Sequence, residues 1–441
     1  MRKSLVLLVA VFIGACTSDD GGSGIPISSC SNDGQKQFVA DAMREWYFWN
    51  HLLPADVDIS QFATPDDVLA FLTSFSPDDG TGQPIDRFSF INSAQADQAF
   101  FGEGRFEGFG FSSRFVAADD LRLTRVFLDS PAYRAGLRRG QRILALDGRT
   151  IAEIEGAEGV GAVFALPTLD FMMRDTDGSE FTVSVAKEIV TIDPVPQYRI
   201  IDAGGGRNVG YIELASFIST ADIQMDSAFA QFNAAGVNEV IIDLRYNGGG
   251  LVSTAVLLGD FFGGDVAENL VFSKTVFNDL RAPANNTTTF FARLLNSVSL
   301  SRLVVIATGN TASASELVIN GMDPHVEVTI VGANTFGKPV GQVGLEFCDQ
   351  ILRPTAFQTM NANDFGDYFD GLPVDCPAAD DLNVAVGADI DPNMVAALGF
   401  LATGSCPVAS SPAAQFKLGA ERAIRQPDRR GPPHRVFADA Y

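Results

Sequence analysis

The spacing of hydrophobic residues divides the chain into regions with different periods. Between Gln37 and Leu53, apolar side chains recur at three- and four-residue intervals, which predicts a helix with one buried face. A second helix is predicted after Thr64, because Thr followed by Pro and two acids is a typical helix start. These helices predict a small helical domain over residues 36–105.

The pattern changes to that of short strands over residues 106–187. Leu121 to Phe127 alternates apolar and polar side chains, and residues 140–148 form an apolar run that closes in an Asp-Gly turn. The region opens on the sequence Gly-Phe-Gly-Phe at 108–111. This pattern predicts a separate domain that is rich in strands.

Strands and helices alternate in the third region, residues 188–403. The run 209–214 and the near-continuous apolar run 240–244 are typical of strands, and residues 221–235 between them have a helical pattern. Strands without alternation are expected where both faces of a sheet are buried. A final helix is predicted after Asp391, so the region is expected to form an α/β core.

The first residues have the features of an export signal. A basic start is followed by an apolar run, Leu5 to Ile13, that is too short to span a bilayer. Residues 13–16, Ile-Gly-Ala-Cys, resemble the bacterial lipobox, so residues 1–16 are expected to be a lipoprotein signal with Cys16 as the lipidated residue. Thr17 in place of Asp after this cysteine is typical of delivery to the outer membrane.

The segments beyond the predicted domains have the composition of unstructured chain. Residues 17–35 are rich in Ser, Gly and Asp, which predicts a flexible tether to the membrane. Residues 404–441 are rich in Pro and Arg and are expected to be disordered. We therefore expect a lipid-anchored protein of the bacterial cell envelope that faces the periplasm.

Charge and histidine content exclude several classes of function. A formal net charge of −23 argues against a nucleic-acid partner. The three histidines are widely separated, and His325 alone lies near a motif described below. The chain therefore has too few suitably placed histidines to favour a His-based catalytic triad or a multi-His metal site. Neither a metal nor a cofactor is expected.

Four cysteines remain once Cys16 is set aside. An even number in an exported chain predicts disulfides, and four cysteines allow three connectivities. We expect Cys348 to pair with Cys376, and Cys30 with Cys406, so that the second bridge clamps the two ends of the folded region.

Three motifs supply candidate chemistry. Ser313 lies in the small-residue turn 311–316, which opens a helix, and Lys338 lies in residues 335–342, about one helix and one strand later. Well before them, a buried strand ends in the glycine-rich residues 243–250. A hydroxyl, an amine base and a glycine-rich backbone turn are the parts of a hydrolase that uses a Ser–Lys pair.

Each motif also has an ordinary structural interpretation. Ser313 with Glu316 fits a helix capping box, Lys338 fits a surface loop, and residues 248–250 fit a flexible turn. A phosphate-binding loop is disfavoured because no Gly-Lys-Ser/Thr follows the glycines. Asp243 and Arg245 flank a buried strand end and are expected to be structural.

From Gln37 to Ala402 the chain resembles the C-terminal processing peptidases, also called tail-specific proteases. The similarity lies in Ser-Ala-Ser-Glu at 313–316, Thr-Phe-Gly-Lys at 335–338, the glycine-rich turn and, more weakly, Asp-Arg-Phe-Ser-Phe at 86–90. The resemblance implies that Ser313 is the nucleophile, Lys338 the general base and Gln342 the residue that orients the lysine. It also implies an oxyanion hole formed by the backbone N–H groups of Ala314 and Gly249, although the choice among Gly248, Gly249 and Gly250 stays open.

The resemblance also carries a fold and a function. It implies a crotonase-like α/β core of the ClpP/crotonase type, with a PDZ domain inserted at 106–187. Gly108, Phe109, Gly110 and Phe111 would then bind the C-terminal tails of polypeptide substrates. The expected activity is that of a serine endopeptidase. A catalytically silent peptide-binding scaffold is the alternative, and an acyl-CoA enzyme is disfavoured because CoA is cytosolic.

Overall fold

The computed structural model of the protein describes residues 29–407. The expected signal at 1–16 with Cys16, most of the expected tether and residues 408–441 of the expected tail lie outside the described residues. Between residues 29 and 407, no helix has the length and apolar character needed to cross a membrane.

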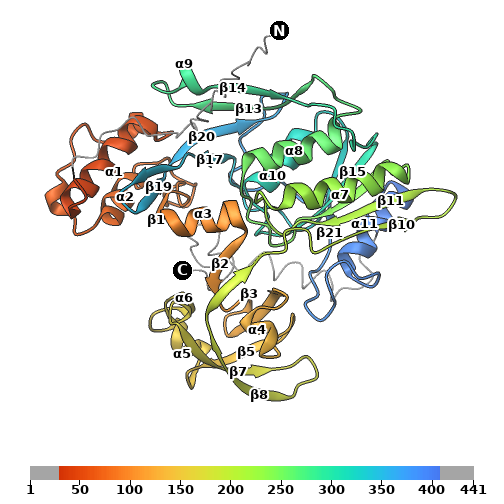
Figure 1. The fold of residues 1–441 in the computed structure, drawn as a ribbon, viewed down its shortest axis with the longest axis horizontal. Helices are drawn as coiled ribbons and strands as arrows, with labels where there is room; N and C mark the ends of the chain where they lie inside the picture. The colour runs from red at the N-terminus through yellow and green to blue at the C-terminus, as the bar shows by residue number, and fades with distance from the viewer. Residues whose placement is uncertain (1–28, 408–441) are drawn as a thin grey trace, which may run out of the picture.

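The centre of the molecule is a six-stranded sheet in the order β10-β11-β12-β15-β16-β21 (Figure 1). The strands from β11 to β21 are parallel, and β10 is an antiparallel edge strand. Their bounds are β10 Gln197–Asp202, β11 Asn208–Glu213, β12 Glu239–Asp243, β15 Arg302–Ala307, β16 Glu327–Gly332 and β21 Cys376–Pro377. The predicted alternation of strands and helices is therefore confirmed for this region.

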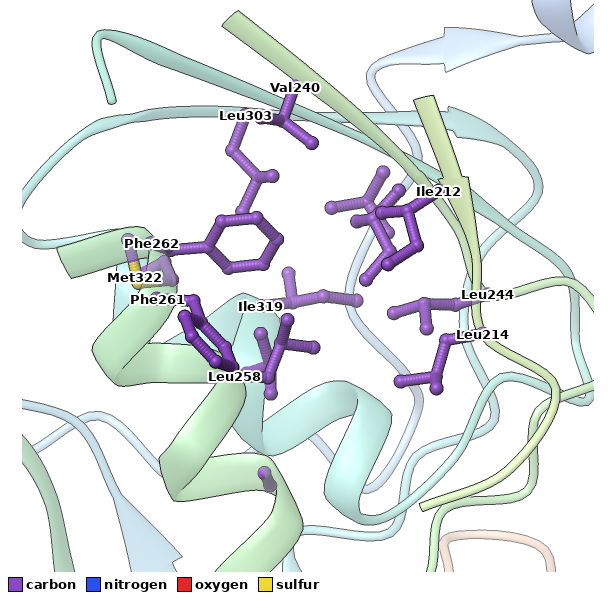
Figure 2. Packing of buried hydrophobic residues seen from close by; sticks show 14 of the residues in the cluster. Ile212, Leu214, Val240, Leu244, Leu258, Phe261, Phe262, Leu303, Ile319 and Met322 are labelled. Atoms are coloured by element: carbon purple, nitrogen blue, oxygen red, sulfur yellow. The ribbon is translucent and has the colours of Figure 1, made fainter. Parts of the chain in front are cut away.

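Helices cover both faces of this sheet. Alternate residues of β12 point to opposite sides, so Val240 and Ile242 pack in one buried cluster while Ile241 packs in another. Figure 2 shows the first cluster, where side chains of β11, β12 and β15 meet those of α8 and α10. The helices on that side are α7 (Ala221–Ala234), α8 (Val252–Gly263) and α10 (Ala314–Met322), and α11 (Pro392–Thr403) covers the other side.

Two smaller sheets extend the core toward the N-terminal domain. One has the order β14-β13-β20-β17 and the other β1-β19-β18. Residues 282–290 form a short helix and an edge strand of the first sheet. The elements are β1 Phe90–Ser93, β13 Val271–Phe277, α9 Ala282–Asn285, β14 Thr287–Phe290, β17 Val340–Gln342, β18 Leu345–Phe347, β19 Gln350–Arg353 and β20 Thr355–Met360.

The N-terminal domain is helical, as its pattern predicted. It contains α1 (Asn32–Trp46), the short turns η1 (Asn50–Leu52) and η2 (Ile59–Gln61), α2 (Pro65–Thr73) and α3 (Ala94–Glu103). Thr64 caps α2 in a reciprocal pair with Asp67, which confirms the predicted helix start. The first helix begins and ends earlier than the apolar pattern predicted, because the chain leaves the helix at Tyr47 while its aromatic residues continue to be buried.

Residues 106–187 lie almost entirely in a separate domain with its own sheet, β3-β4-β5-β7-β8 with β6 beside β5. Figure 1 shows this inserted domain set apart from the core and joined to it near β2. Strands β2 (Arg105–Gly108) and β9 (Glu188–Thr191) pair as an antiparallel stem. The other elements are β3 Phe111–Ala117, β4 Asp120–Val126, α4 Pro131–Arg134, β5 Arg142–Leu146, β6 Arg149–Thr150, α5 Ile151–Glu155, α6 Val160–Phe164, β7 Thr168–Arg174 and β8 Glu180–Ala186.

The cysteines form two disulfides, but the predicted pairing is wrong. Cys30 is bonded to Cys348, and Cys376 is bonded to Cys406. Pairing by sequence distance failed because Cys348 lies in the turn between β18 and β19, beside the N-terminal domain, whereas Cys376 lies in β21. The first bridge therefore ties the N-terminal domain to the core, and the second ties the residues after α11 to β21.

Candidate active site

The three candidate motifs meet at one edge of the central sheet. The glycine-rich turn follows β12, the Ser313 loop follows β15, and the Lys338 loop follows β16. These strands are parallel neighbours, so their carboxyl ends lie at the same edge, where ligands bind in open α/β sheets. The loops are also joined to one another, since Ala312 N–H donates to Asn247 O (3.0 Å) and Phe336 N–H to Thr311 O (2.9 Å).

Ser313 stands at the N-terminus of α10 in a strained backbone conformation. Its φ of 56° and ψ of −116° lie outside the regions that a non-glycine residue ordinarily adopts. Gly249 packs directly against it, and a Cβ at that glycine would lie 2.7 Å from the Ser313 Cβ. Ser315, the nearest other serine, is fully buried and donates its hydroxyl to Asn247 O. Ser313 is therefore the hydroxyl that this turn presents.

Lys338 lies in a partly enclosed position with few polar partners. Its Nζ donates to Gln342 Oε1 over 2.8 Å and lies 5.4 Å from the centroid of the Phe88 ring. Burial lowers the pKa of Lys338 to about 8, against the carboxylates of Asp86 and Glu316, which raise it. Both acids are brought close by the fold, because the sequence has no acid within four residues of the lysine.

Glu316 connects the serine loop to the lysine loop. Its fully buried carboxylate accepts the N–H groups of Ser313 (2.9 Å), Gly337 (2.7 Å) and Lys338 (2.9 Å) and the hydroxyl of Thr335 (2.5 Å). Burial raises the pKa of Glu316, and these four donors oppose that shift. The sequence suggested only a helix cap here, because the contacts to residues 335–338 arise from tertiary structure.

The predicted oxyanion donors differ in availability. The N–H of Ala314 has no acceptor within residues 29–407, as expected at the first position of a helix. The N–H of Gly249, however, donates to Asn247 Oδ1 over 2.9 Å. In this arrangement Ala314 is a free donor, whereas Gly249 contacts Ser313 but is already paired, which the sequence did not anticipate.

No hydrogen bond joins Ser313 Oγ to Lys338 Nζ in the described part of the chain. The amine instead donates to Gln342, which in turn donates to Phe88 O over 2.5 Å. The predicted partnership of Lys338 with Gln342 is thus present as a contact, and Phe88 is a further neighbour that sequence reasoning missed. Its only signal was the Asp-Arg-Phe-Ser-Phe motif at 86–90.

A buried ion cluster lies beneath the glycine-rich turn. Arg245 is fully buried and pairs with Asp243 (2.6 Å) and Asp391 (2.5 Å), the latter being the N-cap of α11. Asp380 lies 3.4 Å from the same guanidinium. This arrangement fits the structural role expected of Asp243 and Arg245.

The inserted domain contacts the same cluster. Arg139 donates to Tyr246 Oη over 2.8 Å and to Asp380 Oδ1 over 2.8 Å, and Tyr246 donates to Asp380. Tyr246 is the residue before Asn247, whose side chain holds the N–H of Gly249. The hydrogen bonds of Arg139 therefore reach the residue next to Asn247, and so connect the inserted domain to the turn beside Ser313.

The predicted peptide-binding residues lie at the start of the inserted domain. Gly108 belongs to the stem, and the side chains of Phe109 and Phe111 are fully buried in that domain's core. Gly110 O accepts the N–H of Phe127 over 2.9 Å. All four residues are buried, and the edge strand β3 begins at Phe111.

His325 takes no part in the site, although it is the histidine nearest to Ser313 in sequence. Its ring nitrogen bonds to Val271 O over 2.8 Å, and the ring packs edge-on against Phe291. Among the described residues, no group of three or more His, Cys, Asp or Glu side chains is arranged to hold a metal ion.

Comparisons with known proteins give matches to two family models, one for the region of Ser313 and Lys338 and one for the region of Phe88. Residues 208–366 match the model of peptidase family S41, and residues 34–90 match the model of the S41 N-terminal domain. The carboxyl-terminal-processing protease of Synechocystis is 28% identical over 236 residues, which is 52% of this chain and 52% of that protein. Chloroplastic carboxyl-terminal-processing peptidase 3 of Arabidopsis thaliana is 26% identical over 47% of this chain and 41% of that protein.

The chain thus spans about half the length of the curated relatives that it matches. Two solved structures share its fold. A protein assigned to the S41 proteases from Bacteroides fragilis has a TM-score of 0.65 at 23% identity, covering 83% of this chain and 97% of that one. The photosystem II D1 C-terminal processing protease has a TM-score of 0.51 at 19% identity, covering 80% and 94%.

Proposed function

The chain belongs to peptidase family S41, the C-terminal processing peptidases, and on that premise we propose that it is a serine endopeptidase acting through Ser313 and Lys338. The observation that carries this proposal is the carboxylate of Glu316, which binds the backbone of both residues and so holds a strained serine beside a desolvated lysine. Neither the capping nor the surface-loop interpretation requires the two loops to share one buried acid.

The chemistry follows from the protonation state of the lysine. The neutral amine of Lys338 takes the Ser313 proton as Oγ attacks the scissile carbonyl, and the resulting ammonium then protonates the leaving amine. Water, deprotonated by the same amine, hydrolyses the acyl-enzyme. The N–H of Ala314 at the helix N-terminus stabilises the oxyanion, and Gly249 adds a second donor when its bond to Asn247 opens.

Because Lys338 donates to Gln342 and not to Ser313, its side chain must turn toward the serine before catalysis. Gln342 Oε1 accepts a hydrogen bond from one N–H of the amine, which orients the lone pair of the neutral amine toward other partners. Substrate binding and a rotation of the Lys338 side chain would then bring Nζ to Ser313 Oγ. Catalytic hydrogen bonds are often long before substrate binds, so the resting geometry is compatible with this role.

We assign the central region a crotonase-like core and the inserted domain a PDZ role in capturing substrate tails. The edge strand β3 supports this assignment, because Phe164 of α6 packs edge-on against Phe111 of β3 and so places a helix beside the edge. A peptide that adds a strand between these elements would be bound by its backbone. The proposed substrates are periplasmic polypeptides with accessible C-terminal tails, met by an enzyme anchored through Cys16 to the outer membrane.

The proposal is tested with a serine-directed fluorophosphonate probe and a peptide substrate. The wild-type chain should be labelled at Ser313 and should hydrolyse the peptide, with activity rising as the pH passes through about 8, because protonated Lys338 cannot act as a base. Ser313→Ala should lose both reactions, and Lys338→Arg should lose hydrolysis because arginine stays protonated. A folded wild-type protein that neither reacts nor cleaves would favour the silent peptide-binding scaffold instead.

A further inference from the structure

The surroundings of Lys338 are completed by Phe88, a residue of the turn before β1. Gln342 Nε2 donates to Phe88 O over 2.5 Å, and the Phe88 ring lies 5.4 Å from Lys338 Nζ. Phe88 therefore contacts the lysine directly and also holds the amide that accepts the lysine's hydrogen bond. A displacement of this turn would disturb both contacts at once.

A single buried carboxylate, that of Asp86, holds this turn. Its Oδ1 accepts the N–H groups of Phe88 (2.9 Å) and Ser89 (3.0 Å), and its Oδ2 accepts the Ser89 hydroxyl (2.6 Å). A side chain that binds two consecutive N–H groups after it fixes the conformation of the turn. The position of Phe88 is thus set by Asp86, which is only 3% exposed.

Asp86 also joins the turn to the strands that carry Gln342. Thr355 Oγ1 donates to Asp86 Oδ1 over 3.0 Å, and Thr355 N–H donates to Ser89 Oγ over 2.9 Å. Thr355 is the register partner of Gln342 where β20 pairs with β17. The N-terminal turn and the lysine's amide partner are therefore held in one hydrogen-bonded unit.

The charge of Asp86 acts on the same amine. Burial is the largest influence on the pKa of Lys338 and lowers it, Arg353 lowers it further, and the carboxylates of Asp86 and Glu316 raise it. Removing the charge of Asp86 therefore lowers the pKa of Lys338. The charged and titratable groups around the pair are Glu316, Arg353, Arg87 and Tyr47.

We infer that Asp86 is a positioning residue for the general base: it fixes Phe88 and, through Phe88, keeps Gln342 in contact with Lys338. The inference rests on the proposed function, since it gives the N-terminal domain a part in the catalytic step. Asp86 does not meet the reacting atoms and acts only through these neighbours.

The test compares Asp86→Asn with Asp260→Asn in the full chain. The first change removes the charge and replaces Oδ2, which accepts the Ser89 hydroxyl, while Oδ1 can still accept the two backbone N–H groups. The chain should therefore fold, but the turn that carries Phe88 should be held less firmly. Asp260 is a matched control, because it is also a buried carboxylate that accepts a backbone N–H, that of Ala292, but it has no contact with the lysine. Competitive amine labelling read by mass spectrometry gives the pKa of Lys338 without any need for peptidase activity, and peptide hydrolysis is followed across the same pH range.

In Asp86→Asn we expect a lower Lys338 pKa, an activity rise displaced to lower pH, and a plateau kcat reduced about tenfold or more by misplacement of the base. Asp260→Asn should leave all three unchanged. An Asp86→Asn variant with the wild-type lysine pKa and plateau kcat would overturn the inference, and so would equal changes in the control. A wild-type chain without Ser313-dependent hydrolysis would overturn the proposed function instead, while the labelling would still report whether Asp86 controls the lysine.

Discussion

The two domains attached to the catalytic core are joined to it in opposite ways. The N-terminal domain shares its apolar core with the core strands, and Phe38 of α1 stacks on Phe347 of β18 with ring centroids 4.7 Å apart. Val340 and Leu345, on strands next to the lysine loop, belong to the same buried cluster. Separating this domain would expose one continuous hydrophobic core, so it is part of the catalytic body.

The inserted domain has a buried cluster of its own, drawn from residues 109–185. It meets the core through the stem and through arginines, including Arg125 with Glu213 (2.6 Å) and Arg139 with Asp380 (2.8 Å). The small apolar cluster of Phe127, Val190 and Ile218 also lies at this boundary, but the inserted domain keeps its own larger core when the ion pairs open. Domain movement is the ordinary expectation for a boundary of this kind. The comparison indicates that one attached domain builds the site while the other can move relative to it.

The strongest test of this contrast is to excise the inserted domain. Gly108 and Glu188 are register partners in the stem, so residues 109–187 can be replaced by an Asn-Gly turn that closes a hairpin. The shortened chain should fold and cleave a short peptide at a rate near the wild type. Cleavage of a protein substrate with a C-terminal tail should fall about 10²-fold or more, because local capture is lost. Equal losses on both substrates would mean that the domain is needed to form the site.

Matched substitutions of two buried phenylalanines should separate the folding units. Phe38→Ala should lower the free energy of unfolding of the catalytic body by about 3–5 kcal/mol and reduce peptide cleavage with it. Phe164→Ala should destabilise the inserted domain by a similar amount and leave cleavage of a short peptide intact, since its ring packs within that domain. Denaturant unfolding followed by hydrogen exchange would distinguish the units, and one shared transition in both variants would contradict the contrast.

The two disulfides should differ in their effect on stability. Cys30–Cys348 closes a sequence separation of 318 residues and ties the N-terminal domain to the core, whereas Cys376–Cys406 closes 30. Because a longer loop restricts the unfolded chain more, the first bridge should contribute about 2 kcal/mol more to the free energy of unfolding than the second. Replacing both cysteines of the first bridge by serine should therefore lower the denaturant midpoint more than the same change in the second. Non-reducing peptide mapping checks the connectivity itself, and a Cys348–Cys376 peptide would contradict it.

The smallest effect is expected from the contact between the inserted domain and the glycine-rich turn. Arg139→Met should weaken docking by about 1 kcal/mol, because Asp380 keeps its other arginine partners. Burial raises the pKa of Asp380, but its arginine partners outweigh burial and hold that pKa at about 2, so its stabilising charge is lost only as the pH falls through that value. In Arg139→Met this loss should begin at a higher pH.

Stability measured against pH would show the difference caused by Arg139→Met. Arg134→Met is the control, because Arg134 forms an exposed ion pair with Glu188 and should have little influence on stability. An acid unfolding profile identical to that of the wild type in Arg139→Met would mean that this arginine does not stabilise the docked arrangement.

Local pattern was sufficient for much of this protein. The apolar runs located the parallel strands, and Ser313 and Lys338 were named from short motifs. Gln342 was named only through the resemblance to the C-terminal processing peptidases. Strand alternation and helix caps depend on neighbours within a few residues, so the sequence carries them directly. The first helix shows the limit, because aromatic burial continues past Trp46 after the helix itself has ended.

Only tertiary structure decided which distant groups are partners. The cysteine pairing could not be read from spacing, because the entropy of closing a loop changes slowly with its length and does not select one pair strongly over another. The sequence placed Glu316 at a helix start and residues 86–90 in a motif, but not against Lys338. Those contacts exist because packing brings separate loops within hydrogen-bonding distance of one another. The bond that occupies Gly249 N–H is local, since Asn247 lies only two residues earlier in the same turn.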